Sequence, residues 1–480
     1  MKHILRRHYR LRIPALVVVL FPLVVLPESA ARAQQDRPNV VIFVVDDARV
    51  DDLSSMPIVQ SLIADEGATF TNAFAPFPLC CPARATLLTG QYAHNHGVLG
   101  NSAPQGGFHA FDDSQTLATW LNDTYTTGFV GKYLNAYGSK GTSTYVPPGW
   151  DAWRAALQPT IYMNPRFNTD GTVSTYSGGY IADVVTELAD TFIRTKAEPF
   201  FLFTSFSAPH AGTPLEADDP QIVYGRSGFP TPNVASRHRN ELTDLPLDPG
   251  PAFNEADVRD KPKQEPLLAP WEIDAITEVN QQRREALLYV EDAVERIVAT
   301  LVERGELDNT YLIFTSDNGY MLGEHRIRGG KATPYEEAIG VPLLIRGPGI
   351  PAGSVVNQPV GGQDVSTVLA MTGLSDAAGG FAMDGIDLLP LITDPSLYAD
   401  RPIVLEWGPT DSSGDYEFHG IRTAQWKYVV RKRGAVELYD MVRDPYELDN
   451  RANKQKWAAV QAEYDTLLQE YMFCAESTCR

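Results

Sequence analysis

Short apolar runs of strand length alternate with helix-like patterns along most of the chain. The runs occupy residues 40–45, 200–206, 311–315 and 342–345. Apolar runs of this length, bounded by polar residues, are typical of strands that are buried on both faces. Because helical segments separate these strands, the pattern predicts an α/β fold with helices on both faces of a sheet.

The clearest helical pattern precedes the third of these runs. Apolar side chains recur there at three- and four-residue steps, at Leu287, Val290, Val294, Ile297 and Leu301. This spacing places them on one face of an amphipathic helix. Gly305 follows the last of them, and a glycine in this place commonly ends a helix.

Two stretches depart from the alternation. Residues 211–270 are rich in Pro, Asp and Asn and predict a long surface excursion, which is either a lid or binding loop or a plain exposed insertion. Beyond residue 394 the runs are short, and a helical pattern ends the chain. They occupy residues 403–407, 420–423, 427–431 and 436–439, with the helix over 456–472. We therefore expect a second domain, residues 395–480, with a small antiparallel sheet and a terminal helix.

The first 33 residues form a separate kind of segment. Five Lys or Arg residues between Lys2 and Arg12 precede an apolar run over residues 13–26, and Ala31-Arg32-Ala33 follows. A positive leader, a short apolar run and a small-x-small site together indicate a signal peptide, with an uncleaved anchor as the alternative. No later run is apolar enough to span a bilayer. We expect residues 1–33 to be removed and the chain to be secreted or periplasmic, without stable membrane insertion.

The charge balance is strongly acidic. The chain has 60 Asp and Glu against 40 Lys and Arg, a formal net charge of −20. Removal of the basic leader would make it more acidic still. This balance argues against nucleic acid as a partner. If the substrate is an anion, basic side chains must gather locally at its site.

The four cysteines fall into two close pairs. Export permits disulfides, and we expect Cys474 and Cys479 to close a small loop at the C-terminus. Cys80 and Cys81 are adjacent, and a disulfide between neighbours is strained. A disulfide therefore does not explain why two neighbouring thiols stand at the start of a helix.

Polar pairs follow two of the predicted strands directly. Asp46-Asp47 ends the first run, and Asp317-Asn318 ends the third. Functional sites of open α/β sheets gather at the carboxyl ends of strands, and oxygen-bearing side chains suit a hard divalent cation such as calcium. Either pair alone is better explained as a turn or a helix cap. Two pairs at strand ends favour a metal site.

The segment Cys80-Cys81-Pro82-Ala83-Arg84, followed by Thr89-Gly90, is far more specific. It resembles the C-x-P-x-R signature of the sulfatase family. In that family a formylglycine-generating enzyme oxidises the first cysteine, which is Cys80 here, to formylglycine. The resemblance implies an alkaline-phosphatase-like α/β fold with a large mixed sheet, a catalytic domain over residues 34–394 and the smaller C-terminal domain.

Further matches extend over nearly the whole chain after the leader. They are Arg37-Pro38-Asn39 with Asp46-Asp47, residues 131–135, residues 316–319, Lys331 with Tyr335-Glu336, and Trp426-Lys427-Tyr428. Within the family, the chain is most similar to the N-acetylglucosamine-6-sulfatases. The residues behind this likeness are Cys80-Cys81-Pro82, His94-Asn95-His96, and residues 131–135 and 146–151.

The resemblance also implies roles for the matched residues. One hydroxyl of a formylglycine hydrate attacks sulfur, and deprotonation of the other expels sulfate. One calcium ion would be held by Asp46, Asp47, residue 80, Asp317 and Asn318. Arg84 would bond the hydrate or the metal-side carboxylates.

Three further residues would supply the local positive charge that the acidic chain lacks. By resemblance, Lys132 and Lys331 bind the sulfate oxygens, and His210 is a candidate general acid for the leaving oxygen. Outside family motifs, each lysine would be better explained as a solvated residue and His210 as a loop histidine.

One position departs from the pattern of many sulfatases. Where they carry a histidine two residues after the central lysine, this chain has Leu134, followed by Asn135. Leucine cannot move a proton, so the base that eliminates sulfate has no assignment. His94, His96 and His325 are candidates for that base, and substrate-binding roles for them and for Asn135 are the alternative.

The sequence therefore predicts a sulfuric ester hydrolase acting on sulfated sugars or amino sugars. Two rival hypotheses stay open. One is a phosphonate monoester or phosphodiester hydrolase, because relatives on this fold use the same cysteine conversion. The other is a catalytically silent sulfated-glycan binder, against which the intact Cys80, Arg84 and Lys132 argue.

Overall fold

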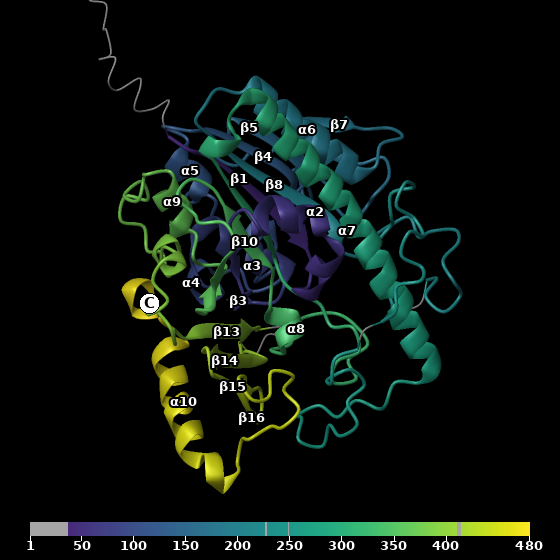
Figure 1. The fold of residues 1–480 in the computed structure, drawn as a ribbon, viewed down its shortest axis with the longest axis vertical. Helices are drawn as coiled ribbons and strands as arrows, with labels where there is room; N and C mark the ends of the chain where they lie inside the picture. The colour runs from purple at the N-terminus through teal and green to yellow at the C-terminus, as the bar shows by residue number, and fades with distance from the viewer. Residues whose placement is uncertain (1–36, 226–227, 248, 410–413) are drawn as a thin grey trace, which may run out of the picture. The chain divides into compact units, whose positions relative to one another are not determined.

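The computed structural model describes residues 37–225, 228–247, 249–409 and 414–480 (Figure 1). The expected signal peptide, residues 1–33, lies outside the described residues. Among those described, no helix is both long and apolar enough to cross a membrane.

A ten-stranded sheet forms the centre of the fold. In sheet order its strands are β11 (Ser354–Val356), β2 (Ala68–Phe70), β10 (Leu343–Arg346), β9 (Thr310–Ser316), β1 (Asn39–Asp46), β8 (Phe200–Pro209), β4 (Thr126–Lys132), β5 (Ala152–Ala156), β6 (Arg166–Thr169) and β7 (Thr172–Thr175). Strands β9, β1, β8, β4 and β5 pair in parallel, whereas β10 and β6 pair antiparallel to their neighbours. The sheet is therefore mixed, and the four predicted buried strands are confirmed as β1, β8, β9 and β10.

Strand β1 lies at the middle of this sheet and is buried along its whole length. Val40, Ile42 and Val44 share a core cluster with helices α3 (Cys80–Thr89), α5 (Leu117–Leu121) and α9 (Ser366–Met371). The alternate side chains of β1 share a second cluster with α6 (Ile181–Thr195) and α7 (Pro270–Arg304). Because neighbouring strand residues point to opposite faces, one apolar run supports both helical layers (Figure 1).

Helix α7 extends well beyond the predicted pattern. The sequence indicated its C-terminal half, and Gly305 ends it in the left-handed conformation with φ 72°. The N-terminal half carries buried polar residues, among them Gln281 and Glu285. Gln281 donates to the carbonyls of Thr243 and Leu245, and Glu285 accepts from the Asn240 and Leu242 N–H groups. Polar side chains that satisfy another segment's backbone interrupt the apolar repeat, so periodicity could not show this half.

The segment between β8 and α7 is the predicted surface excursion. Its described residues contain no named helix or strand. Polar side chains of α7 bind its backbone, and it is therefore fixed along that helix instead of standing free.

The C-terminal sheet is confirmed as small and antiparallel. Its strands, paired in chain order, are β13 (Ile403–Trp407), β14 (Phe418–Arg422), β15 (Trp426–Arg431) and β16 (Val436–Asp440). The predicted terminal helix is α10 (Ala458–Tyr471), whose Tyr464 and Leu468 pack with Val404, Ile421 and Tyr428 of the sheet. The domain boundaries at residues 33/34 and 394/395 stay predictions.

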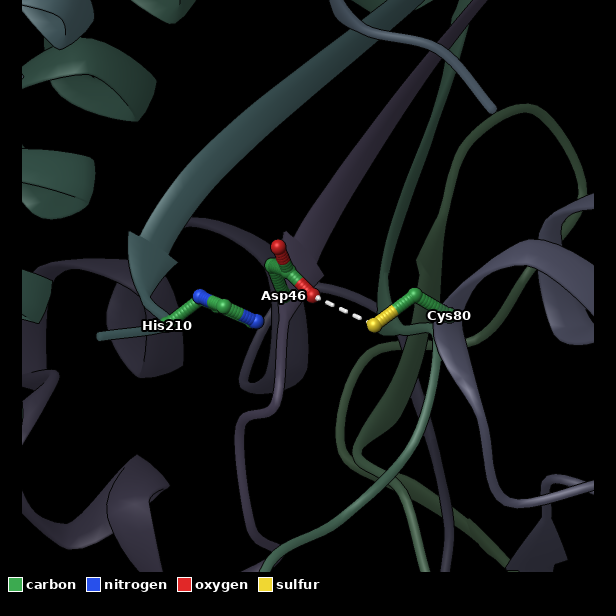
Figure 2. Close-up of side chains that lie close together, drawn as sticks. All are labelled: Asp46, Cys80 and His210. Carbon is green, nitrogen blue, oxygen red and sulfur yellow. Dashed lines mark hydrogen bonds between the residues drawn. The ribbon is translucent and has the colours of Figure 1, made fainter. Parts of the chain in front are cut away.

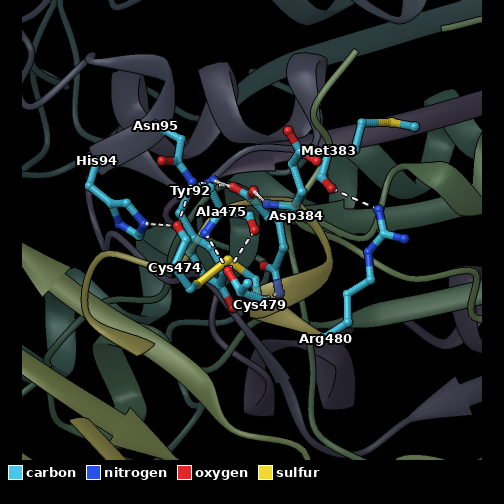
Figure 3. The surroundings of a disulfide bond; sticks show 12 residues. Tyr92, His94, Asn95, Met383, Asp384, Cys474, Ala475, Cys479 and Arg480 are labelled. Carbon is cyan, nitrogen blue, oxygen red and sulfur yellow. Dashed lines mark hydrogen bonds between the residues drawn. A yellow bond between two sulfur atoms is a disulfide. The ribbon is translucent and has the colours of Figure 1, made fainter. Parts of the chain in front are cut away.

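Cys474 and Cys479 form a disulfide that closes the C-terminal loop (Figure 3). The loop is bound to helix α4 (Ala93–His96), which follows α3 in the chain. His94 Nε2 lies 2.9 Å from the Cys474 carbonyl oxygen, and Asn95 Nδ2 donates to the same oxygen at 2.9 Å. The end of the chain is thereby attached to the segment that follows the Cys80 helix.

The His94 ring makes the stability of this attachment depend on pH. Its Nδ1 lies 3.1 Å from the buried Glu406 carboxylate. Burial lowers the pKa of His94, but Glu406 and the Cys474 carbonyl outweigh burial and raise it to about 8. Since an unfolded histidine titrates near about 6.5, the protonated ring stabilises the fold fully below that pH, and this contribution is lost as pH rises through 8.

We therefore predict that His94→Gln lowers the free energy of unfolding more at pH 6 than at pH 9. A pKa of about 8 in the fold against about 6.5 in the unfolded chain corresponds to a difference of roughly 2 kcal/mol between the two pH values. Urea denaturation of wild type and variant at both pH values measures it. His109 is exposed, and His109→Gln therefore serves as the control. An equal loss at the two pH values would show that the His94 ring is not charged in the fold.

Candidate active site

The site is built at the carboxyl end of β1, where Asp46 and Asp47 are buried. Asp47 adopts φ 74°, a left-handed conformation that is unfavourable for a residue with a side chain. The end of β9 holds this turn, because the Asp47 N–H donates to Asp317 Oδ1 at 3.1 Å and the Ala48 N–H donates to Ser316 Oγ at 2.9 Å. Both predicted polar pairs therefore meet at one point.

Helix α3 begins at Cys80 and presents this residue to the carboxylates. Cys80 Sγ lies 3.4 Å from Asp46 Oδ1, and Figure 2 shows Asp46 between Cys80 and His210. Cys81 instead packs in the apolar core. Its N–H donates to Asn101 Oδ1 at 3.0 Å. The two neighbouring thiols thus have different surroundings, and the described structure keeps both as free cysteines.

Arg84 lies one turn along α3 and contacts three neighbouring strands or the residues that follow them. Its Nε donates to Asp317 Oδ2 at 2.7 Å, and its Nη1 donates to Ser205 Oγ at 2.6 Å and to the Lys132 carbonyl at 2.9 Å. These contacts link β9, β8 and β4 to the Cys80 helix. Arg84 therefore holds a carboxylate in place and neutralises it at the same time.

Lys132 enters the site from the end of β4. Its ammonium group is buried and pairs with Asp46. The preceding Gly131 has φ 110°, and a Cβ there would lie 1.8 Å from the Ser205 carbonyl oxygen. Only glycine permits this close approach of β4 to β8, which is why Gly131 precedes the lysine.

Lys331 and His210 complete the positive side of the site. Lys331 pairs with Asp47, and its Nζ lies 2.9 Å from Cys80 Sγ. His210 Nδ1 is 2.6 Å from the Ala211 carbonyl oxygen, to which it donates, and its Nε2 is 3.9 Å from Asp47 Oδ2. The local gathering of basic groups that an anionic substrate requires is therefore present in an acidic chain.

The ionisation of the site follows from burial and close charges. Burial raises the pKa of Asp46, but Lys132, His210 and Arg84 outweigh burial and hold it well below the usual range. Burial also lowers the pKa of His210. Burial and the Asp46 carboxylate raise the pKa of Cys80 to about 12, so the unmodified thiol stays protonated at neutral pH.

The donor set at this point fits a hard divalent cation. Ligand atoms of Asp46, Asp47, Cys80 and Asp317 all lie within 4.8 Å of one another. Asn318 Oδ1 is buried and has no hydrogen-bond partner among the described residues. The Asn318 Nδ2 donates to Asp47 Oδ1 at 2.7 Å, so the amide reaches the carboxylates and would turn its oxygen toward a bound ion. Three carboxylates with an amide oxygen suit a calcium-type site.

The three histidines considered as elimination bases have their contacts elsewhere. His94 bonds Glu406 and Cys474. His96 has Nε2 3.0 Å from Thr86 Oγ1, and its Nδ1 accepts from the Val98 N–H. Burial lowers the pKa of His96 to about 4. His325 bonds Glu255. The structure places none of these rings in contact with Cys80. Both ring nitrogens of His94 and of His96 are occupied, which does not favour a substrate-binding role for them, whereas His325 Nε2 has no hydrogen-bond partner among the described residues.

Asn135 follows Lys132, the last residue of β4, by three positions. Its carbonyl oxygen accepts from the Phe108 N–H, and its buried side-chain Oδ1 has no hydrogen-bond partner among the described residues. The structure gives no direct contact between this side chain and the carboxylates. A substrate-binding role for Asn135 stays a prediction.

Arg283 of α7 is a residue that sequence reasoning missed. Its Nη2 donates to the Asp47 carbonyl at 2.5 Å, and its Nη1 donates to the Pro209 carbonyl at 3.5 Å. Its guanidinium also lies 4.3 Å from the centre of the Tyr320 ring. It thus contacts the segments at the ends of β1, β8 and β9. The available signal was its position four residues before Leu287, which puts a charge in phase with the buried face of the helix.

Comparisons with known proteins agree with this geometry. The model of the family described as Sulfatase matches residues 38–374, and the model described as N-sulphoglucosamine sulphohydrolase, C-terminal, matches residues 323–472. An arylsulfatase of Volvox carteri is 34% identical, over 97% of this chain and 79% of the relative. The N-acetylglucosamine-6-sulfatase of Homo sapiens is 32% identical, over 77% of this chain and 67% of the relative.

A solved structure extends the likeness to the fold. A protein in complex with its substrate, D-glucosamine-2-N,6-O-disulfate, has a TM-score of 0.70 and 24% identity, covering 90% of this chain and 97% of that one. The fold is therefore the alkaline-phosphatase-like α/β fold that the motifs implied. The chain belongs to the sulfatase family of sulfuric ester hydrolases.

Proposed function

We propose that the chain hydrolyses sulfate esters of sulfated sugars, in particular amino sugars, with a nucleophile made from Cys80. The observation that carries this proposal is the position of Cys80 Sγ, 2.9 Å from Lys331 Nζ and 3.4 Å from Asp46 Oδ1 at the start of α3. A protonated thiol there is a poor nucleophile. Oxidised to formylglycine and hydrated, residue 80 would supply two hydroxyls on one carbon, one to attack sulfur and one whose deprotonation releases sulfate.

Lys132 and Lys331 would bind the sulfate oxygens from two sides. Each ammonium group lies beside a carboxylate at the end of β1 and is buried or nearly so. In such surroundings a charge attracts an anion more strongly than it does in water. The anionic group of the ester would therefore be held against residue 80.

His210 would donate the proton that the leaving sugar oxygen needs. The Ala211 carbonyl accepts the Nδ1 proton and so orients the ring, which leaves Nε2 facing the site. Because Nδ1 keeps its own proton, Nε2 carries one only in the imidazolium form, which the Asp46 and Asp47 carboxylates favour and burial opposes. In that form His210 can give the Nε2 proton to the departing oxygen. The base that removes a proton from the hydrate has no assignment, because Leu134 cannot serve and the other histidines have their contacts elsewhere.

Asp46, Asp47, Asp317 and Asn318 would hold one calcium ion together with residue 80. The ion would neutralise sulfate oxygens and lower the pKa of the attacking hydroxyl. Arg84 would keep the Asp317 carboxylate in position, since it donates to Oδ2 while the Asp47 N–H occupies Oδ1. These four side chains and Arg84 form one connected unit.

The proposed substrate class rests on the named relatives. A human relative is an N-acetylglucosamine-6-sulfatase, and the structural neighbour binds a glucosamine disulfate. We extend that substrate class to this chain as a proposal. Export by the leader, maturation by a formylglycine-generating enzyme outside this chain, and a secreted or periplasmic location belong to the same proposal.

We predict that residue 80 has lost its thiol in active protein. Mass spectrometry of the tryptic peptide over residues 50–84 should show formylglycine at position 80 and an intact thiol at position 81. Cys80→Ala should abolish turnover while the unfolding midpoint stays within a few degrees, because alanine fits the helix start. Cys81→Ala is the control for the neighbouring position. Full activity of Cys80→Ala, or an unmodified peptide from an active preparation, would refute the mechanism.

We predict that Arg283→Met lowers kcat by about 10- to 100-fold, because two carbonyls at strand ends lose a charged donor worth roughly 1.5–3 kcal/mol. Arg283→Lys should recover part of this loss. The matched control is Arg284→Met, since the neighbouring arginine contacts Ser54, Ser55 and Asp51 instead of the strand ends. It should lower the unfolding midpoint but leave kcat unchanged. Equal effects of the two variants on kcat would show that Arg283 acts through stability alone.

We predict that the enzyme turns over 6-O-sulfated N-acetylglucosamine faster than galactose 6-sulfate, which is measured by sulfate release. We also expect it to turn over nitrophenyl sulfate faster than bis-nitrophenyl phosphate, which is measured by nitrophenol release. A phosphodiester rate above the sulfate rate would favour the phosphodiesterase hypothesis. Glycan affinity without any sulfate release would favour the silent binder.

A further inference from the structure

A second group of ligand-type side chains lies apart from the Cys80 site. A ring nitrogen of His325 and one carboxylate oxygen each of Glu337 and Glu447 lie within 4.8 Å of one another. His325 follows β9, Glu337 lies in helix α8 (Glu336–Ile339), and Glu447 follows β16. The group therefore joins the main sheet's connections to the C-terminal sheet.

The His325 ring is oriented for a ligand. Its Nδ1 lies 2.7 Å from Glu255 Oε2, and its buried Nε2 has no hydrogen-bond partner among the described residues. The side chain is only 2% exposed and packs against the Tyr335 ring, with 4.2 Å between the two ring centres. Histidines that bind metals usually give their other nitrogen to a carboxylate in this way.

Glu337 has an orphaned atom in the same place. Its Oε2 is buried and also has no hydrogen-bond partner among the described residues. A buried polar atom left in this state costs about 1–3 kcal/mol. Two such atoms, one on a histidine and one on a carboxylate of the same group, indicate a missing partner that both can bind.

The neighbouring cations are already paired with other carboxylates. Arg49 lies 2.9 Å from Glu324, and Arg422 lies 2.9 Å from Glu336. Lys427 pairs with Glu447 and also lies 3.2 Å from Glu336. None of these contacts neutralises Glu337. A divalent cation would supply the missing positive charge.

We infer that His325, Glu337 and Glu447 bind a zinc-type divalent ion at a second, structural site. One imidazole nitrogen with two carboxylates suits zinc better than calcium, which prefers oxygen ligands alone. Zinc bonds of about 2.0–2.2 Å place tetrahedral ligands roughly 3.5 Å apart, so the three atoms need to approach one another by little more than ~1 Å. Glu447 would then have zinc as well as Lys427 as neighbours.

This ion would connect the loop that carries Lys331, between His325 and Glu337, to the C-terminal sheet. His325 precedes Lys331 by six residues, and Glu337 follows it by six. Both ends of that loop would be tied to Glu447, beyond β16. The expected effect is on stability and on the order of this loop, and it stands whether or not the proposed substrate is correct.

The test measures bound zinc directly. Full-length protein is treated with a chelator, saturated with calcium and dialysed against dilute zinc chloride, and bound zinc is counted by mass spectrometry of the metal. A Cys80→Ala background is used in parallel, because Cys80 and its carboxylates could also take zinc. We expect one zinc per chain in both backgrounds, with an increase of several degrees in the unfolding midpoint.

Variants locate the ion. Glu337→Gln keeps the size and shape of the side chain and should fold, but it should lose the zinc and the zinc-dependent rise in midpoint. His325→Gln should do the same. The matched control is Glu306→Gln, a buried glutamate of raised pKa near the end of α7, which should keep both. No zinc in the calcium-loaded wild type, or equal zinc in Glu337→Gln and Glu306→Gln, would overturn the inference.

Discussion

The whole site depends on the pairing of opposite charges in a buried place at the end of β1. Asp46 and Asp47 are adjacent and withdrawn from water, and together they would repel each other strongly in a medium of low polarity. Lys132 pairs with Asp46, and Lys331 pairs with Asp47. The four groups can therefore be buried only as a set, and removal of one charge leaves an uncompensated partner that is costly to bury.

The same requirement fixes where the chain's elements end. Lys132 closes β4, Asp317 follows β9 and His210 follows β8. Because β4, β8, β1 and β9 run in parallel, their carboxyl ends meet at one edge, and side chains far apart in the sequence become neighbours. Arg84 and Arg283 then tie these ends together from two helices on opposite faces of the sheet. The parallel strands bring these side chains together, and the two arginines hold the segments at the strand ends in place.

Sequence patterns predicted the elements well where burial is purely apolar. The runs that became β1, β8 and β9 are buried on both faces, and hydrophobicity alone marks them. The N-terminal half of α7 escaped because Gln281 and Glu285 are buried to satisfy another segment's backbone. That contact exists only once the chain has folded, so no local repeat in the sequence could predict it.

The candidate site shows the same division. Of the residues that the motifs singled out, Lys132 lies at a strand end and Cys80 at a helix start, and the loop between β9 and α8 brings Lys331 to them. His94, His96 and His325 were considered for the missing base only because histidine is a suitable chemical type. Their actual partners, such as Glu406 and Glu255, come from segments more than 60 residues away. A residue type indicates what a side chain can do, whereas its partners decide what it does.

The C-terminal sheet contributes to the site without reaching it. Lys331 lies in the loop between β9 and α8, and the residues that follow it are held from β14 and β15. Lys427 Nζ donates to the Pro334 carbonyl at 2.8 Å, and Arg422 bonds Glu336. On the other side, the Ala332 N–H donates to the Pro78 carbonyl, two residues before Cys80. The position of Lys331 against residue 80 therefore depends on ion pairs with a sheet that holds none of the reacting groups, which is a physical reason for the two parts to fold together.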